Sequence, residues 1–136
     1  MFAPVNEVSI VVVALLSVAL FHIWYSPLLF GPFWTRALLR TPDELDFSQK
    51  EMVRLTIVSI LLNIFFFTIV AQWMVQSNHE VRTIYLACIS VCGLMLASMT
   101  GIALWERRPL SYVLVHMGYV ALVLSLGVGV IMYWPW

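Results

Sequence analysis

The sequence has few charged residues and no excess of either sign. Seven Lys and Arg and seven Asp and Glu make up 10% of the 136 residues, whereas soluble domains carry about 25%. Because the net charge is zero, nothing points to nucleic acid as a partner. Hydrophobic residues instead reach 62% of the chain. This composition excludes an ordinary water-soluble domain and indicates a membrane protein.

Cysteine is scarce, and the apolar runs contain no carboxylate apart from Glu7, at the outer end of the first run. Cys88 and Cys92 fall inside one such run and are interpreted as packed thiols, with no disulfide and no redox role. Zinc usually takes three or four protein ligands, and no acidic residue lies deep enough inside the apolar runs to complete a site with the histidines. The sequence has no nucleophilic triad, no phosphate-binding glycine loop and no pair of membrane-embedded carboxylates. We therefore predict no catalytic residue, no metal and no cofactor, and an enzyme is the least supported class.

Four long apolar runs are present, each close to the roughly 20 residues that a helix needs to cross about 30 Å of hydrocarbon. The predicted helices cover residues 5–25, 53–76, 81–105 and 110–134. An open sheet would leave its peptide groups unpaired in lipid, and no alternating pattern suggests a barrel. The sequence predicts an all-α fold, with residues 1–136 forming one integral membrane four-helix bundle.

The distribution of basic residues predicts the orientation of this bundle. Six of the seven lie in the first and third connections or beside them: Arg36, Arg40, Lys50, Arg54, Arg107 and Arg108. Only Arg82 lies on the opposite side. Cytoplasmic loops carry an excess of Lys and Arg, so we expect these two connections in the cytoplasm. Both termini would then lie on the non-cytoplasmic side.

The connections carry recognisable helix-start signals. Ser48 with Glu51 has the spacing of a capping box before the second span, Ser77 with Glu80 has the same spacing before the third, and Pro109 suits the first turn of the fourth.

The first connection is longer than the others and begins with an aromatic motif. Its defining residues are Trp24, Tyr25, Ser26, Pro27, Phe30, Gly31 and Trp34. An apolar and aromatic segment followed by basic residues is typical of a segment in the lipid headgroup region. We predict an interfacial loop or short helix here, and residues 41–44 could begin a further helical turn.

This motif carries a resemblance to a known family. The run WYSPLLFGPFW at residues 24–34, with three more spans after it, resembles the bacterial membrane family called domain of unknown function 1761. Residues 104–110, and the stretch that continues to 134, resemble the last hairpin of that family. The chain departs from the family pattern at His116, where the family commonly has asparagine. The resemblance implies the four-span architecture and a bacterial inner-membrane location, and it supplies no activity.

Small residues recur every four positions on the last two spans. The two stripes are Gly93, Ala97 and Gly101, and Ala121, Ser125 and Gly129. Such stripes let helix backbones approach closely. They predict either an antiparallel pair of these two helices or a contact with another copy of the protein.

Polar side chains gather in the predicted cytoplasmic half of the spans, where buried polar groups are costly and often functional. They are His22, Thr56, Ser59, Asn63, Ser98, Thr100 and His116. If their faces converge, they would line a pocket for a small polar ligand or a lipid headgroup. Taken singly, His22 is close enough to the interface to reach water, and His116 is more simply a hydrogen-bonding partner of a neighbouring helix.

Two hypotheses of function follow. The first is a non-enzymatic membrane protein that acts by association, as a homo-oligomer or as an accessory subunit of a larger membrane complex. The alternative is a small-molecule or lipid-binding or transport protein that uses the polar pocket. Membrane lipids are expected partners in either case.

Overall fold

The structure, a computed structural model, describes residues 5–38, 47–78 and 80–134. Within these residues it contains five helices and no strand: α1 (Glu7–Trp24), α2 (Gly31–Ala37), α3 (Gln49–Gln76), α4 (Val81–Trp105) and α5 (Leu110–Tyr133). All except α2 are long and apolar enough to cross a membrane. The predicted all-α architecture with four spans and a short helix after the first is confirmed. The helical turn predicted at 41–44 and the basic residue Arg40 lie outside the described residues.

One predicted helix-start signal is correct and another is wrong. Ser48 caps α3 through a capping box with Glu51, so this helix begins four residues before the predicted 53. The signal at Ser77 does not start α4, whose N-cap is Glu80 without a side-chain hydrogen bond. Ser77 instead ends α3, and its hydroxyl donates to the Met74 carbonyl at 3.0 Å. A serine beside a sharp turn can thus serve the helix before it as well as the one after it.

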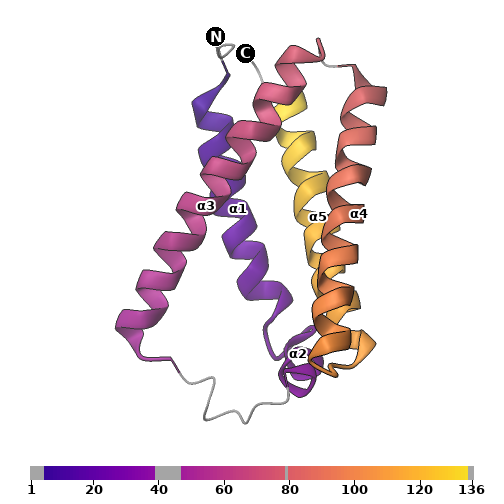
Figure 1. Ribbon diagram of the computed structural model, residues 1–136. Helices are drawn as coiled ribbons and strands as arrows, with labels where there is room; N and C mark the ends of the chain where they lie inside the picture. The colour runs from indigo at the N-terminus through magenta and orange to yellow at the C-terminus, as the bar shows by residue number, and fades with distance from the viewer. Residues whose placement is uncertain (1–4, 39–46, 79, 135–136) are drawn as a thin grey trace.

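The α3–α4 and α4–α5 turns are both short. Asn78 adopts a left-handed φ of 50° directly after α3, a conformation that Asn tolerates better than most residues. Pro109 is the N-cap of α5, one residue before the first helical turn where it was expected. Because these turns are short, α4 runs antiparallel to both α3 and α5 (Figure 1).

The helices pack in the spatial order α3, α1, α5, α4, and α2 lies against α5 (Figure 1). The start of α1, the end of α5 and the α3–α4 turn lie at one end of the molecule, which we call the terminal end. The short helix α2 and the α4–α5 turn lie at the other, which we call the α2 end. The first and third connections therefore share one end, as the distribution of basic residues requires. Which end faces the cytoplasm stays a prediction.

Helix α3 diverges from the bundle toward the α2 end (Figure 1). Its 28 residues span roughly 42 Å at 1.5 Å per residue, which exceeds the hydrocarbon thickness of about 30 Å and favours a tilt. The buried residues of α3 all lie between Phe67 and Met74, near the terminal end. The core of the protein therefore lies in the terminal half.

Gly127 makes room for the centre of this core. The Phe67 ring is fully buried, and a Cβ on Gly127 would overlap with it. Val13 of α1 lies 3.0 Å from the same Cβ position. Helices α1, α3 and α5 therefore meet closely at one glycine, as small residues permit in membrane bundles.

Candidate functional site

The aromatic motif forms a tight reversal between α1 and α2. Past the end of α1, the Phe30 amide donates to the Trp24 carbonyl and the Gly31 amide to the Ser26 carbonyl, each at 3.0 Å. A Cβ on Gly31 would lie 2.6 Å from the carbonyl oxygens of Tyr25 and Ser26, so only glycine fits there. Pro32 then occupies the first turn of α2, where its missing N–H costs nothing. These residues direct α2 back onto the first turns of α5.

Trp24 attaches this reversal to the backbone of α5. Its indole Nε1 donates to the Val115 carbonyl at 3.0 Å. The far edge of its ring lies 3.0 Å from the position that a Cβ on Gly118 would take. The ring also contacts Phe30, with ring centroids 4.5 Å apart. The glycine at 118 therefore lets the indole approach α5 closely.

Tyr25 and His116 join the two ends of the sequence through a side-chain hydrogen bond. The Tyr25 hydroxyl and the His116 Nδ1 are 2.8 Å apart, although 91 residues separate them in the chain. Trp34 of α2 stacks on His116 and on Tyr112, with centroid distances of 5.8 and 4.9 Å. Tyr119 completes the group, and its hydroxyl donates to the Ser17 carbonyl of α1 at 3.0 Å.

We call this group the aromatic–histidine cluster. It consists of Trp24, Tyr25, Phe30, Trp34, Tyr112, His116 and Tyr119. All seven side chains are half-buried, at the junction of α1, α2 and α5.

A basic residue borders this cluster at the start of α5. The Arg108 guanidinium lies over the Tyr112 ring at 4.9 Å from its centroid, a favourable cation–π arrangement. Arg108 also forms an ion pair with Glu106 in the α4–α5 turn. Burial raises the pKa of the Tyr25 phenol, which lies just past the end of α1, above its usual range. The Tyr25 hydroxyl therefore stays neutral and available for the hydrogen bond to His116.

The chemistry of the cluster is that of a joint between helices. It combines three long-range hydrogen bonds with stacked rings, and each bond satisfies a polar group that would be costly to leave unpaired in the membrane. No three His, Cys, Asp or Glu side chains in the described residues lie close enough together to hold a metal ion. The arrangement fixes the α1–α2 reversal and α2 against α5.

Sequence reasoning identified only part of this cluster. The interfacial motif and His116 were identified as separate features, and the structure brings them together. The roles of Tyr112 and Tyr119 were missed. Their spacing from His116, at four residues before and three after, places all three on one face of a helix and is the signal that could have found them.

The other residues proposed for a polar pocket do not join the cluster. His22 is exposed, and its Nδ1 forms a hydrogen bond with the Val18 carbonyl of its own helix at 2.8 Å. The Asn63 amide donates to the Ser59 carbonyl one turn earlier, also at 2.8 Å. The remaining candidates divide between half-buried and exposed positions: Thr56 and Thr100 are half-buried, and Ser59 and Ser98 are exposed. Across the described chain no hydrogen bond joins any of these six side chains to another of them, or to His116, on a different helix, so the pocket stays a prediction.

The small-residue stripes lie away from tight internal contacts. Helices α4 and α5 pack side by side, but a Cβ on Gly93, Gly101 or Gly129 would meet no atom within 4 Å. Ala97 and Ala121 are exposed. The space beside these glycines is open to whatever surrounds the helices.

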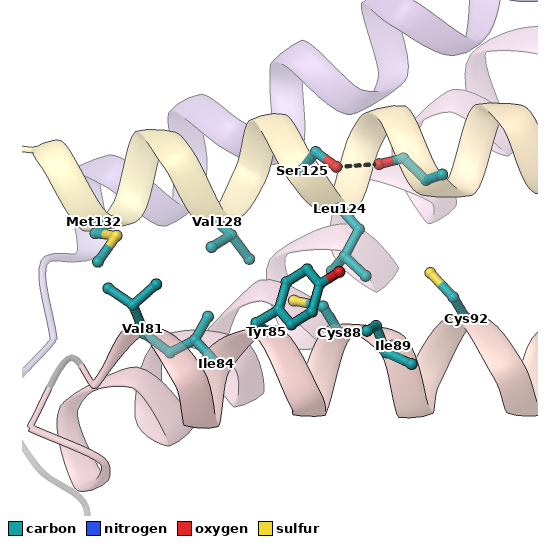
Figure 2. Close-up of a pocket in the computed structure, with 11 residues that line it drawn as sticks. Val81, Ile84, Tyr85, Cys88, Ile89, Cys92, Leu124, Ser125, Val128 and Met132 are labelled. Carbon is teal, nitrogen blue, oxygen red and sulfur yellow. Dashed lines mark hydrogen bonds between the residues drawn. The ribbon is translucent and has the colours of Figure 1, made fainter.

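A groove lies between α4 and α5 in the terminal half (Figure 2). Its volume is about 320 Å³, and it runs from Val81 and Met132 at the terminal end to Cys92 and Ala121 nearer the middle. Cys88 and Cys92, both free thiols, lie along its α4 wall. Ala121 and Ser125 of the predicted α5 stripe line the groove. The groove itself was not predicted, because helical periodicity shows which residues share a face and not how closely two faces meet.

Comparison with known protein families identifies a match over most of the chain. A family model described as "Protein of unknown function (DUF1761)" matches residues 8–133, a range that includes most of α1 and all the later helices. No curated protein and no solved structure matches the chain.

Proposed function

The chain belongs to the family described as "Protein of unknown function (DUF1761)", and from that premise we propose that it is a non-enzymatic membrane protein that acts by association with a second copy of itself. The surface that carries this proposal is the side of α4 bearing Gly93, Ala97 and Gly101, which we call the α4 stripe.

The weak packing of α4 within the chain supports this surface. In the described structure α4 packs substantially on α5 alone, whereas α1 packs on both α3 and α5. Only 6% of the most apolar stretch of α4 is buried, against 33% for α1. Association between membrane helices depends on close packing, because lipid tails are as apolar as leucine. A helix with so little internal packing has the most to gain from a partner.

The shape of the exposed side favours another helix over lipid. Gly93 and Gly101 have open space where a side chain would stand, and Ala97 between them is exposed. Larger exposed side chains flank them, with Leu94 71% and Leu96 46% exposed. A shallow backbone channel with leucine sides allows close approach of a second helix in a right-handed crossing.

A second copy is the partner that this surface suits best. Two copies inserted in the same orientation can pair their α4 stripes about a two-fold axis along the membrane normal, so that one patch serves both sides of the contact. The crossing point would lie near Ala97, the middle residue of the stripe. The outcome would be a dimer with two α4 helices at its centre and the aromatic–histidine clusters away from the contact.

Cysteine crosslinking in membranes tests this arrangement. The variant Ala97→Cys, in a Cys88→Ser and Cys92→Ser background, should form a disulfide-linked dimer under mild oxidation. Ile102→Cys in the same background is the matched control, because Ile102 is 49% exposed but lies about 140° around the helix from residue 97. It should crosslink weakly.

Native mass spectrometry from mild detergent provides the second measurement. The unmodified chain should be dimeric, and Gly101→Leu should weaken the dimer by roughly ten-fold, the change that about 1.4 kcal/mol produces. A monomer in detergent together with equal crosslinking at residues 97 and 102 would disprove the proposal. A heteromeric complex without self-association would favour an accessory subunit instead.

We also infer a location in the bacterial inner membrane with the α2 end in the cytoplasm. Arg36, Lys50, Arg54 and Arg107 lie in or beside the connections at the α2 end, whereas Arg82 follows the α3–α4 turn at the terminal end. In intact cells, a membrane-impermeant maleimide should label a cysteine introduced at Asn78 in the background without native cysteines. Labelling only after lysis would reverse this orientation.

A further inference from the structure

The groove between α4 and α5 has an apolar lining. Ser125 is one of the few polar residues in it, and its hydroxyl is already satisfied by donating to the Ala121 carbonyl at 2.7 Å. Water in such a space would lack the two to four polar partners that hold a buried water in place. The groove therefore suits hydrocarbon.

The length of the groove matches one leaflet of a bilayer. Val81 and Cys92 mark its two ends on α4 and are 11 residues apart, which corresponds to about 16 Å of helix. Half of the hydrocarbon core is roughly 15 Å. Val81 is the first residue of α4, and Cys92 lies near the middle of that helix. If α4 spans the bilayer, the groove begins at the membrane surface and ends near the bilayer centre.

The groove opens sideways toward the lipid. Tyr85 and Ile89 line it from α4 and are 65% and 50% exposed. Figure 2 shows the Tyr85 ring between the two helices, with Met132 at the end nearest Val81. A chain lying along the groove would contact α4 on one side and α5 on the other.

A basic residue, Arg82, follows Val81 at the mouth of the groove. Arg82 is exposed and has no ion pair among the described residues. It precedes Tyr85 by three residues, so its position lies about 60° around α4 from the tyrosine that lines the groove. The nearby Glu80 carboxylate accepts a hydrogen bond from the Thr83 hydroxyl at 2.6 Å. Glu80 is the N-cap residue of α4, but its carboxylate does not cap the helix, so the first-turn amides have no side-chain acceptor.

We propose that this groove is a specific site for one acyl chain of an anionic phospholipid, drawn from the leaflet at the terminal end, with the lipid phosphate against Arg82. The Arg82 charge at the mouth and a groove length that matches one leaflet together favour a phospholipid over an uncharged apolar molecule. The site is separate from the α4 stripe, and it does not depend on dimer formation.

Depth-resolved photolabelling tests the position of the acyl chain. The full-length protein is reconstituted in phosphatidylcholine vesicles with a trace of phosphatidylglycerol that carries a diazirine either near the ester or near the end of its acyl chain. The shallow probe should label Val81 and Met132, and the deep probe should label Cys92 and Ala121. The reverse order, or uniform labelling of all four spans, would overturn the proposed lipid site.

Two substitutions test the groove and its charge separately. Val128→Phe fills the groove and should lower groove labelling roughly ten-fold, whereas Val58→Phe, the same change at a position 45% exposed on α3, should not change it. Arg82→Gln should remove the preference for phosphatidylglycerol over phosphatidylcholine while leaving labelling by depth in place.

Two further measurements distinguish a lipid from a second copy of the protein as the occupant of the groove. Circular dichroism and the crosslinking at residue 97 should be unchanged in Val128→Phe, which shows that the variant folds and associates as before. Undiminished groove labelling in this folded variant would overturn the proposal. Crosslinks between Cys88 or Cys92 of two copies would also overturn it, because another chain would then fill the groove.

Discussion

Replacement of Tyr25 by phenylalanine isolates the contribution of one hydroxyl in the aromatic–histidine cluster. The ring contacts would stay, including those with Phe21 and Trp34 at centroid distances of 4.6 and 4.8 Å. The loss is the 2.8 Å hydrogen bond to His116 Nδ1. A hydrogen bond contributes about 0.5–1.5 kcal/mol to stability, and those between membrane helices average about 0.6 kcal/mol. We expect Tyr25→Phe to lower the free energy of unfolding by roughly 0.5–1.5 kcal/mol.

Substitution of the partner residue should have a graded effect. His116→Leu leaves the Tyr25 hydroxyl unpaired in a half-buried position and also removes the stacking of the imidazole on Trp34. An unpaired buried group costs about 1–3 kcal/mol, so this variant should be the less stable of the two. His116→Asn keeps a polar atom bonded to Cγ, close to where Nδ1 stands, and should lose less than about 1 kcal/mol. The expected order of destabilisation is His116→Leu, then Tyr25→Phe, then His116→Asn.

A double-mutant cycle measures the interaction itself. Reversible unfolding in mixed micelles, followed by circular dichroism, gives the free energy for each variant and for Tyr25→Phe combined with His116→Leu. The coupling energy should be about 0.5–1.5 kcal/mol. His22→Leu is the matched control, because that exposed imidazole bonds only to its own helix, and it should change stability by less than about 0.5 kcal/mol. A coupling energy indistinguishable from zero, or equal losses in the leucine and asparagine variants, would refute the role assigned to this bond.

Two glycine substitutions extend these tests, with Gly129→Ala as the common control because its Cβ would meet no atom within 4 Å. Gly31→Ala places a Cβ 2.6 Å from two carbonyl oxygens and should destabilise the protein by about 1–3 kcal/mol in the same unfolding assay; a loss no larger than that of Gly129→Ala would contradict the geometry of the reversal. Gly127→Ala should cost a similar amount by displacing the Phe67 ring. Phe67→Leu in that background should recover part of the lost stability. If the losses of the two substitutions simply add, the proposed contact between Gly127 and Phe67 is wrong.

The four spans were predictable from sequence because their cause is local. In lipid a helix satisfies its peptide groups within its own segment, so apolar length alone determines where it can form. The capping box at Ser48 was predictable for the same reason, since both partners lie within one turn. Ser77 could not be assigned in this way. The local sequence permits it either to end α3 or to cap α4, and the path of the turn places it at the end of α3.

The candidate sites depended on the tertiary structure. Whether His116 meets Tyr25, 91 residues away, depends on how far α5 is rotated and shifted against α1. The glycines show the same limit, because Gly127 is pressed against Phe67 while Gly93 faces open space, although both lie in apolar helices. Sequence alone determined which segments enter the membrane, since that is set by the chemistry of each segment with its solvent. Only the tertiary structure decided the cluster, the exposed stripe and the groove, because these arise from side-chain packing between helices, for which no single segment carries a signal.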